Sequence, residues 1–334
     1  MEPVREQILN LQHISYTYHT LQGETLALSD ISFSLKKGEF AAIVGPSGCG
    51  KSTLLSLICG LLPCTEGQIK INGKPLKEST TNVGYMLQHD ELFEWRTIYN
   101  NVILGLEVQH ALTARTKQRA HELLDIYGLG DFKNARPSEL SGGMRQRVVI
   151  AIALACDPDL LICDEPTTAL DVTIQAKILE LIRSIQKERG ISVIYITHDL
   201  GVVAKVADYV DVMYAGKIVE TGTIDEIFYE PRHPYTWGLL SAMPDLDTAD
   251  DRLYTIPGSP PNLLHEKPGD AFAPRNHFAL NIDDEVDPPM FKITDTHYAA
   301  TWLLDPRAPK VDMPPELAQR IARMNRLFDR GGRQ

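Results

Sequence analysis

A glycine-rich stretch that ends in a lysine and two hydroxyl residues points most directly to chemistry. It lies between an apolar run at residues 40–44 and a helical pattern at 54–58. A glycine loop between a strand and a helix is typical of a phosphate-binding site. The backbone N–H groups of such a loop surround the phosphates, and the helix N-terminus adds partial positive charge. Lys51 would reach the β- and γ-phosphates, and the Ser52 hydroxyl would take one position on Mg²⁺. The sequence therefore predicts a nucleoside triphosphate site formed by Gly45, Pro46, Ser47, Gly48, Cys49, Gly50, Lys51, Ser52 and Thr53.

A pair of acids closes a second apolar run, further along the chain. The run 159–163 ends in Asp164 and Glu165. Buried carboxylates seldom serve packing, because desolvation costs free energy unless a partner offsets it. Beyond a phosphate loop, Asp164 would hold Mg²⁺, directly or through water, and Glu165 would polarise the attacking water. The pair therefore predicts hydrolysis of the bound triphosphate.

Strands alternate with helices along the first two thirds of the chain. Continuous apolar runs, rather than alternating ones, indicate a parallel sheet that is covered on both faces. We expect strands at 8–18, 26–35, 40–44, 68–73, 83–87, 159–163 and 192–197, and a terminal hairpin at 209–219. We expect helices at 114–127, after 143 as far as 155, at 172–189 and at 315–328.

Length and charge limit the classes of function. The 334 residues allow two domains, and the net charge of −11 argues against a general nucleic-acid binder. No apolar run approaches the roughly 20 residues that span a bilayer, so we expect a soluble chain that reaches a membrane only by docking. The five cysteines show no metal-ligand spacing, and we expect reduced thiols, with Cys49 a small filler. Prolines cluster beyond residue 231, where we place a domain boundary before a loop-rich tail.

The most specific signal is the sequence LSGGMRQR at residues 140–147, which precedes a helix and the acidic strand. With it the chain resembles the ATP-binding-cassette (ABC) ATPases, whose signature more commonly reads LSGGQ. The resemblance implies that Ser141, Gly142 and Gly143 contact ATP, and that Tyr18, with Tyr16 as its neighbour, stacks on the adenine. It further implies these roles for motif residues: Gln88 senses Mg²⁺ and the attacking water, Asp171 ends the interface loop 169–171, and His198 contacts the γ-phosphate.

The resemblance also implies a fold and an assembly. We expect an α/β P-loop NTPase ABC nucleotide-binding domain at 1–230, with a RecA-like core, an antiparallel β subdomain and a helical subdomain at about 89–157. Residues 231–334 would form an extension of the oligopeptide-transporter type. Two cassettes would meet head to tail, so that Lys51 and Glu165 of one face Ser141 and Gly143 of the other. A second ABC subunit, transmembrane permease subunits and, indirectly, an extracytoplasmic solute-binding protein would be partners at the cytoplasmic face of the cell membrane.

Two importer branches share the resemblance. Residues 38–110, with GYMLQ at 84–88, look like the nitrate/sulfonate/taurine importer ATPases. Residues from 142 onward, with RHPYT at 232–236, look like the oligopeptide and dipeptide/nickel importer ATPases. We favour the peptide branch because its resemblance spans more of the chain, with the nitrate/sulfonate/taurine branch as the alternative. The first branch implies a homodimer and the second a heterodimer, and the sequence leaves both open, as it does the solute.

Members of the peptide branch often carry four cysteines in the extension, which bind an iron–sulfur cluster. The matching positions here are Asp270, Asn276, Asp283 and Thr301, so thiolate ligands are missing and we expect no cluster. The acids near Asp283 could bind a hard cation, but a solvated acidic loop is the favoured interpretation.

Non-transport ABC ATPases are the remaining alternative. DNA-repair and chromosome-structural members need a long coiled coil between Gln88 and the signature, and no sustained heptads occur there. Translation and regulatory factors usually join two cassettes, whereas this chain has one phosphate loop and one signature.

Overall fold

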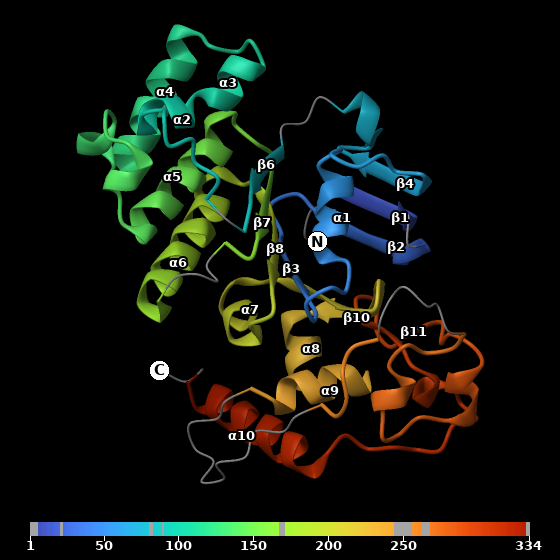
Figure 1. The fold of residues 1–334 in the computed structure, drawn as a ribbon. Helices are drawn as coiled ribbons and strands as arrows, with labels where there is room; N and C mark the ends of the chain where they lie inside the picture. Colours follow the sequence, from blue (N-terminus) through green and yellow to red (C-terminus); the bar gives the residue numbers. More distant parts are fainter. Residues whose placement is uncertain are drawn as a thin grey trace.

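The computed structural model describes residues 6–20, 23–79, 83–88, 90–166, 171–243, 256–261 and 268–331. Its central element is an eight-stranded sheet with the strand order β11-β12-β10-β9-β3-β8-β7-β6 (Figure 1). The parallel strands are β3 (Phe40–Val44), β6 (Val83–Met86), β7 (Leu160–Asp164), β8 (Ser192–Thr197) and β9 (Tyr209–Tyr214). Strands β3, β7 and β8 are buried along their whole length, which explains their continuous apolar sequences.

Alternate residues of the parallel strands enter two separate cores. Phe40 and Ala42 of β3 pack in the core formed with α5 (Gly142–Ala155), α6 (Val172–Arg189) and α7 (Leu200–Val206). Ala41 and Ile43 face the other core, which includes α1 (Lys51–Ile58) and a second sheet. The second sheet is antiparallel and contains β1 (Gln7–Thr20), β2 (Gly23–Lys36), β4 (Glu66–Ile71) and β5 (Lys74–Pro75). Figure 1 shows α5 and α6 on the opposite side of the central sheet from α1.

A group of helices lies outside α5, between β6 and β7 in sequence. These are α2 (Ile98–Val102), α3 (Leu104–Val108) and α4 (Ala114–Ile126), and all of them contact α5 (Figure 1). The expected α/β class, with an antiparallel β part and a helical part beside a parallel core, is confirmed. The helices predicted at 114–127, before 155 and at 172–189 occur within a few residues of the predicted bounds.

Residues beyond 231 complete the central sheet. The predicted hairpin forms from β9 and β10 (Lys217–Thr223), but β10 is not the edge of the sheet. It pairs with β12 (Tyr298–Ala300), which pairs with β11 (Met290–Lys292), both antiparallel. The predicted C-terminal helix is α10 (Pro315–Gly331), which packs on α8 (Ile224–Tyr229) and α9 (Pro234–Ser241) (Figure 1).

A fully buried carboxylate ties this C-terminal part to β10. Glu220 accepts hydrogen bonds from the backbone N–H groups of Arg232 (2.6 Å) and His233 (3.1 Å). Its Oε1 atom also lies 2.8 Å from Nε2 of His297, which is buried as well. Because Glu220 has these partners, its burial does not leave an unsatisfied charge in the core. The contacts join the hairpin β9–β10 to both sequence segments that follow it.

A second buried acid, Asp211 of β9, has fewer partners. Its side chain accepts a hydrogen bond of 2.5 Å from the Thr221 hydroxyl, and its Oδ2 atom has no hydrogen-bond partner among the described residues. Burial raises the pKa of Asp211 to about 7, opposed by the Thr221 hydrogen bond and supported by the charge of Glu39. Ionisation of this carboxyl is therefore easier in the unfolded chain than in the folded one.

We expect Asp211→Asn to stabilise the fold by an amount that grows with pH. The folded pKa lies above the unfolded value, so the Asp211 contribution to stability falls as pH rises from about 4 to about 7, by up to ~1.4 kcal/mol per pH unit. Asparagine does not ionise and can still accept the Thr221 hydrogen bond. Urea denaturation of both proteins between pH 5 and pH 8 would measure the difference. Asp131→Asn, at an exposed position, is the control, and a difference for Asp211→Asn that stays constant with pH would contradict the expectation.

Candidate active site

The sequence-predicted chemical groups follow the carboxyl ends of four parallel strands. The phosphate loop follows β3, and Gln88 follows β6. Asp164 ends β7 and Glu165 follows it, and His198 follows β8. Since β3, β8, β7 and β6 are neighbours in this order, their carboxyl ends lie along one edge of the sheet. Ligands of open α/β sheets bind outside this edge. The fold therefore brings together groups that lie up to 153 residues apart in sequence, from Gly45 to His198.

Two glycines of the phosphate loop meet constraints that other residues would not meet. Gly50 has a φ of +101°, and a Cβ at this position would lie 2.5 Å from the Ala27 carbonyl oxygen. A Cβ at Gly45 would lie 2.4 Å from the Met213 carbonyl oxygen. Side chains at either position would collide with backbone, so the loop keeps its shape only with glycine. Helix α1 begins at the next residue, Lys51, and directs its first N–H groups towards the loop.

The Lys51 side chain is buried against its own loop. Its Nζ atom donates to the carbonyl oxygens of Gly45 (2.8 Å) and Pro46 (2.9 Å), and lies 4.0 Å from Cys49 Sγ. Burial raises the pKa of the Cys49 thiol, although the charge of Lys51 opposes this effect. The thiol therefore stays protonated at neutral pH, in agreement with a filler role. The ammonium is placed to exchange loop carbonyls for phosphate oxygens.

Asp164 lies between groups from two other elements. The Ser52 hydroxyl of α1 hydrogen-bonds its carboxylate, and the Tyr85 hydroxyl of β6 donates to its Oδ2 atom at 3.3 Å. The side chain is mostly buried, and burial raises the pKa of Asp164, opposed by these two hydrogen bonds and by the charge of Lys51. A carboxylate beside a hydroxyl supplies the hard oxygen ligands that Mg²⁺ prefers. The donor set present in the chain therefore fits this ion.

Glu165 and His198 are adjacent at the ends of neighbouring strands. The Oε1 atom of Glu165 lies 3.4 Å from Nδ1 of His198, and the Glu165 N–H donates to the Ile196 carbonyl at 3.1 Å. Glu165 has a φ of +45°, a conformation that non-glycine residues rarely adopt and that often occurs at functional sites. Its side chain is 14% exposed, whereas that of His198 is 60% exposed. The carboxylate is thus shielded from bulk solvent, whereas the adjacent imidazole is accessible to it.

Tyr18 and Gln88 are two further residues that the sequence assigns to the ATP site. The Tyr18 hydroxyl is 3.3 Å from Thr53 Oγ1, and the Tyr18 ring packs edge-on against Tyr16 with centroids 5.0 Å apart. Tyr18 rather than its neighbour Tyr16 therefore makes the contact with the phosphate-loop helix that the structure describes. Gln88 is exposed, two residues beyond β6. Adenine stacking by Tyr18 and magnesium sensing by Gln88 stay predictions.

The signature residues lie at a different place on the molecule. Ser141 caps the N-terminus of α5, with its hydroxyl 3.4 Å from the Met144 N–H, and Asp171 caps α6 through the Ile174 N–H at 2.9 Å. Gly143 packs on Ile174, so the two caps are neighbours. In the part of the chain that the structure describes, no hydrogen bond or ion pair joins Ser141, Gly142, Gly143 or Asp171 to the phosphate loop. Ala169 and Leu170, the rest of the predicted interface loop, lie outside the described residues.

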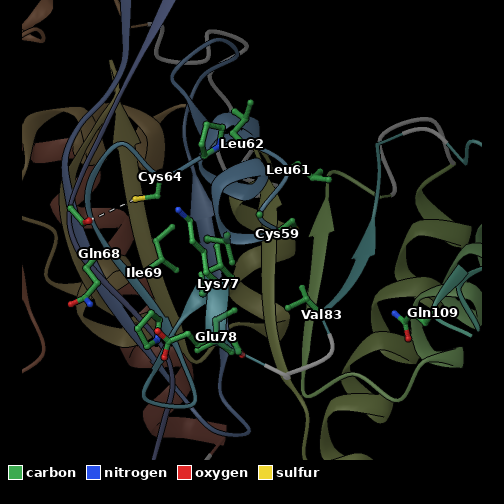
Figure 2. Close-up of a pocket in the computed structure, with 18 residues that line it drawn as sticks. Cys59, Leu61, Leu62, Cys64, Gln68, Ile69, Lys77, Glu78, Val83 and Gln109 are labelled. Carbon is green, nitrogen blue, oxygen red and sulfur yellow. Dashed lines mark hydrogen bonds between the residues drawn. The ribbon is translucent and has the colours of Figure 1, made fainter. Parts of the chain in front are cut away.

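Two hollows among the described residues are lined by residues outside the phosphate loop. One has a volume of about 840 Å³ and lies between the end of α1, the strands β4 and β5, and Val83 (Figure 2). Cys59 and Cys64 line it, and no predicted site residue does. The other, of about 370 Å³, is lined by Leu87, Phe93 and Val108 beside Gln88, and is called the groove below.

An ion-pair network that the sequence did not predict links the groove to the signature helix. Arg145 of α5 donates to Asp90 through Nε (2.6 Å) and Nη2 (2.9 Å). Its Nη2 atom also lies 3.3 Å from Glu94. Such a bidentate pair fixes the relative position of the segment after Gln88 and the helix that begins at the signature. The acidic residues of this segment were the signal in the sequence, but their partner could not be assigned from spacing.

Known families and solved structures are similar to parts of this chain. The family "ABC transporter" matches residues 28–168, and "Oligopeptide/dipeptide transporter, C-terminal region" matches residues 219–282. A dimeric ATP-binding cassette, MJ0796, in a post-hydrolysis state bound to ADP and phosphate, is similar in structure, with a TM-score of 0.59 and 31% identity over 65% of this chain and 98% of that chain. The cbiO1 protein of Clostridium perfringens, part of the ABC transporter complex cbiONQ, has a TM-score of 0.61 and 33% identity over 67% of this chain and 92% of that chain.

Curated relatives match nearly the whole length. The oligopeptide transport ATP-binding protein OppD of Bacillus subtilis is 46% identical, over 97% of this chain and 96% of that protein. The dipeptide transport ATP-binding protein DppD of Lactococcus lactis is 45% identical, over 96% of this chain and 98% of that protein. The chain therefore belongs to the ABC transporter ATP-binding proteins, in the group that includes OppD and DppD. Since the similarity to this group covers almost the entire chain, the nitrate/sulfonate/taurine alternative is not favoured.

Proposed function

We propose that the chain hydrolyses ATP as the motor subunit of an importer for oligopeptides or dipeptides. One observation carries the proposal. The phosphate loop, Asp164, Glu165 and His198 meet at one sheet edge in a chain whose C-terminal part matches the oligopeptide/dipeptide transporter region. An ATPase assay of the purified full-length chain, with and without Mg²⁺, tests the enzymatic part of the proposal. We expect ATP turnover that requires Mg²⁺. Absence of turnover, also when the chain is assayed within the assembled transporter, would refute the enzymatic part of the proposal.

The residues of the site divide the chemical work. The loop N–H groups and Lys51 bind the phosphates and fix the γ-phosphate at the edge of the sheet. Glu165 accepts a proton from the attacking water, and His198 and Gln88 orient this water and the γ-phosphate. Ser52 and Asp164 would hold Mg²⁺, and the bound ion would supply positive charge against the phosphates.

A second cassette is needed to complete each site. Ser141 and Gly143 lie at the start of α5, a helix on the opposite side of the central sheet from α1 (Figure 1), so we expect them to serve the site of a second subunit rather than their own. Their N–H groups, at the start of α5, would stabilise charge on the γ-phosphate of the facing subunit. The second subunit is either another copy or a related chain. Closure upon ATP binding and release after hydrolysis form the two-state element that drives transport.

The groove is the place where we expect a permease helix to dock. Leu87, Phe93 and Val108 give it apolar walls, and Trp95, 72% exposed, packs on Phe93 with ring centroids 4.7 Å apart. An exposed apolar cluster of this kind marks an interaction site. No helix among the described residues is long and apolar enough to cross a membrane. From the similarity to transporter ATP-binding proteins, we infer a peripheral subunit at the cytoplasmic face, which contacts a solute-binding protein only through the permease.

We expect Val108→Glu to remove permease subunits from the purified complex while ATP affinity is retained. Val108 is 71% exposed, so the fold tolerates the change, but the carboxylate would have to be desolvated beneath a docked apolar helix. The recovery of membrane subunits should fall about tenfold or more, as expected for the loss of on the order of 1.4 kcal/mol or more of binding energy. Ile126→Glu, 67% exposed and outside the groove, is the matched control. Equal recovery with both variants would rule out the groove.

We propose that the extension beyond residue 231 folds without an iron–sulfur cluster. Three of the side chains at the matching positions accept hydrogen bonds from the backbone two residues ahead, namely Asp270, Asn276 and Thr301. Asp283 accepts one from the N–H of Leu280. These turns give each of the four side chains a local backbone partner, and none of the four residues supplies a thiolate. Stoichiometric iron and acid-labile sulfide in the purified protein would contradict this proposal.

A further inference from the structure

Tyr85 contacts the predicted ATP site, although none of the sequence motifs gives it a role. It lies on β6, which pairs in parallel with β7, and its register partner is Ile162, two residues before Asp164. The Tyr85 hydroxyl reaches along the neighbouring strand and donates to Asp164 Oδ2 at 3.3 Å. A phenol donates one hydrogen bond at neutral pH because its ordinary pKa is about 10. The contact therefore fixes the Oδ2 atom of Asp164 relative to β6.

The Asp164 carboxylate is held from two directions. Ser52 reaches it from α1, and Tyr85 reaches it from β6, while the residue itself is 8% exposed. Removal of the Tyr85 hydroxyl would leave the Ser52 hydroxyl as the remaining one of these two donors. A ligand carboxylate whose orientation is fixed by an outer hydrogen bond binds a cation more tightly, and removal of such a bond typically lowers metal affinity 10–100-fold.

We propose that Tyr85 is a positioning residue that orients Asp164 for the divalent cation of the ATP site. The proposal rests on the proposed function, since it assumes that Asp164 contributes to a Mg²⁺–ATP site. The contact described for the Tyr85 hydroxyl is with Asp164, so its effect on the cation passes through Asp164. The hydroxyl, rather than the ring, makes the contact, and phenylalanine is the substitution that removes only this group.

The test compares ATP affinity with and without cation. Tyr85→Phe in the full-length chain should leave the affinity for ATP in EDTA unchanged. It should raise the Mg²⁺ concentration that gives half-maximal enhancement of ATP binding by about tenfold, the lower end expected for loss of an outer-shell hydrogen bond. Mn²⁺, observed by electron paramagnetic resonance in the presence of ATP, gives a second readout that does not depend on turnover.

Tyr209→Phe is the matched control. Tyr209 lies in β9 of the same sheet, and its hydroxyl donates to the Thr296 carbonyl at 2.7 Å, away from the site. This variant also loses one hydroxyl hydrogen bond but should show the parental Mg²⁺ dependence. An unchanged Mg²⁺ dependence in Tyr85→Phe, or an equal loss of ATP affinity with and without Mg²⁺, would overturn the positioning role. If the parental chain itself binds ATP without any cation dependence, the Mg²⁺–ATP site of the proposed function fails instead.

Discussion

Lys51→Ala is expected to reduce ATP affinity by roughly 100-fold or more. The Lys51 ammonium is buried in the phosphate loop, where it contacts the carbonyl oxygens of Gly45 and Pro46. Charge-assisted hydrogen bonds in a partly desolvated site contribute on the order of 3–5 kcal/mol when one partner is removed. Equilibrium binding of a fluorescent ATP analogue would measure the loss.

The control for this variant is Lys205→Ala. Lys205 is an exposed lysine in the last turn of α7, so its removal changes the net charge equally without touching the loop. Circular dichroism should show the same fold for both variants. ATP affinity that is unaltered in folded Lys51→Ala would count against the phosphate-loop assignment.

Glu165→Gln is expected to lower ATP turnover by about 10²–10⁴-fold while ATP binding is retained. Glutamine keeps the shape of the side chain beside His198 but cannot accept a proton from the attacking water. If hydrolysis releases the two cassettes, the variant should also accumulate as an ATP-bound dimer. Turnover measured with purified protein, together with size-exclusion chromatography in ATP, would test both expectations.

Glu180→Gln provides the comparison for Glu165→Gln. Glu180 lies exposed on α6 and should show parental turnover and no trapped dimer. Parental turnover in Glu165→Gln, in a preparation of demonstrated purity, would show that another group is the base.

The parts of the site that the sequence could predict are those encoded by local spacing. Strand, loop and helix adjoin one another around Lys51, and Asp164 and Glu165 directly end an apolar run. The carboxyl ends of parallel strands lie at one edge of a sheet. The proximity of these segments to His198 is therefore predictable from the strand pattern alone.

Contacts between distant elements could not be predicted in the same way. The hydrogen bond from Tyr85 to Asp164 depends on the register of β6 against β7, and the Arg145–Asp90 pair depends on how α5 meets the segment after Gln88. The three-residue strands β11 and β12 are too short to show a periodic pattern, so their addition to the central sheet had no signal in the sequence. The proposed boundary near residue 231 therefore separates segments that share one sheet.

The most direct test of the central claim is affinity purification of the tagged chain from the native membrane, with identification of the co-purifying chains. The account predicts permease subunits of the oligopeptide or dipeptide type together with a second ABC subunit, either a related chain or another copy. Recovery of the permease subunits should fall about tenfold or more with Val108→Glu and should be kept with Ile126→Glu. A nitrate-, sulfonate- or taurine-type permease would contradict the proposed substrate class, and the absence of any membrane subunit would contradict the transporter role itself.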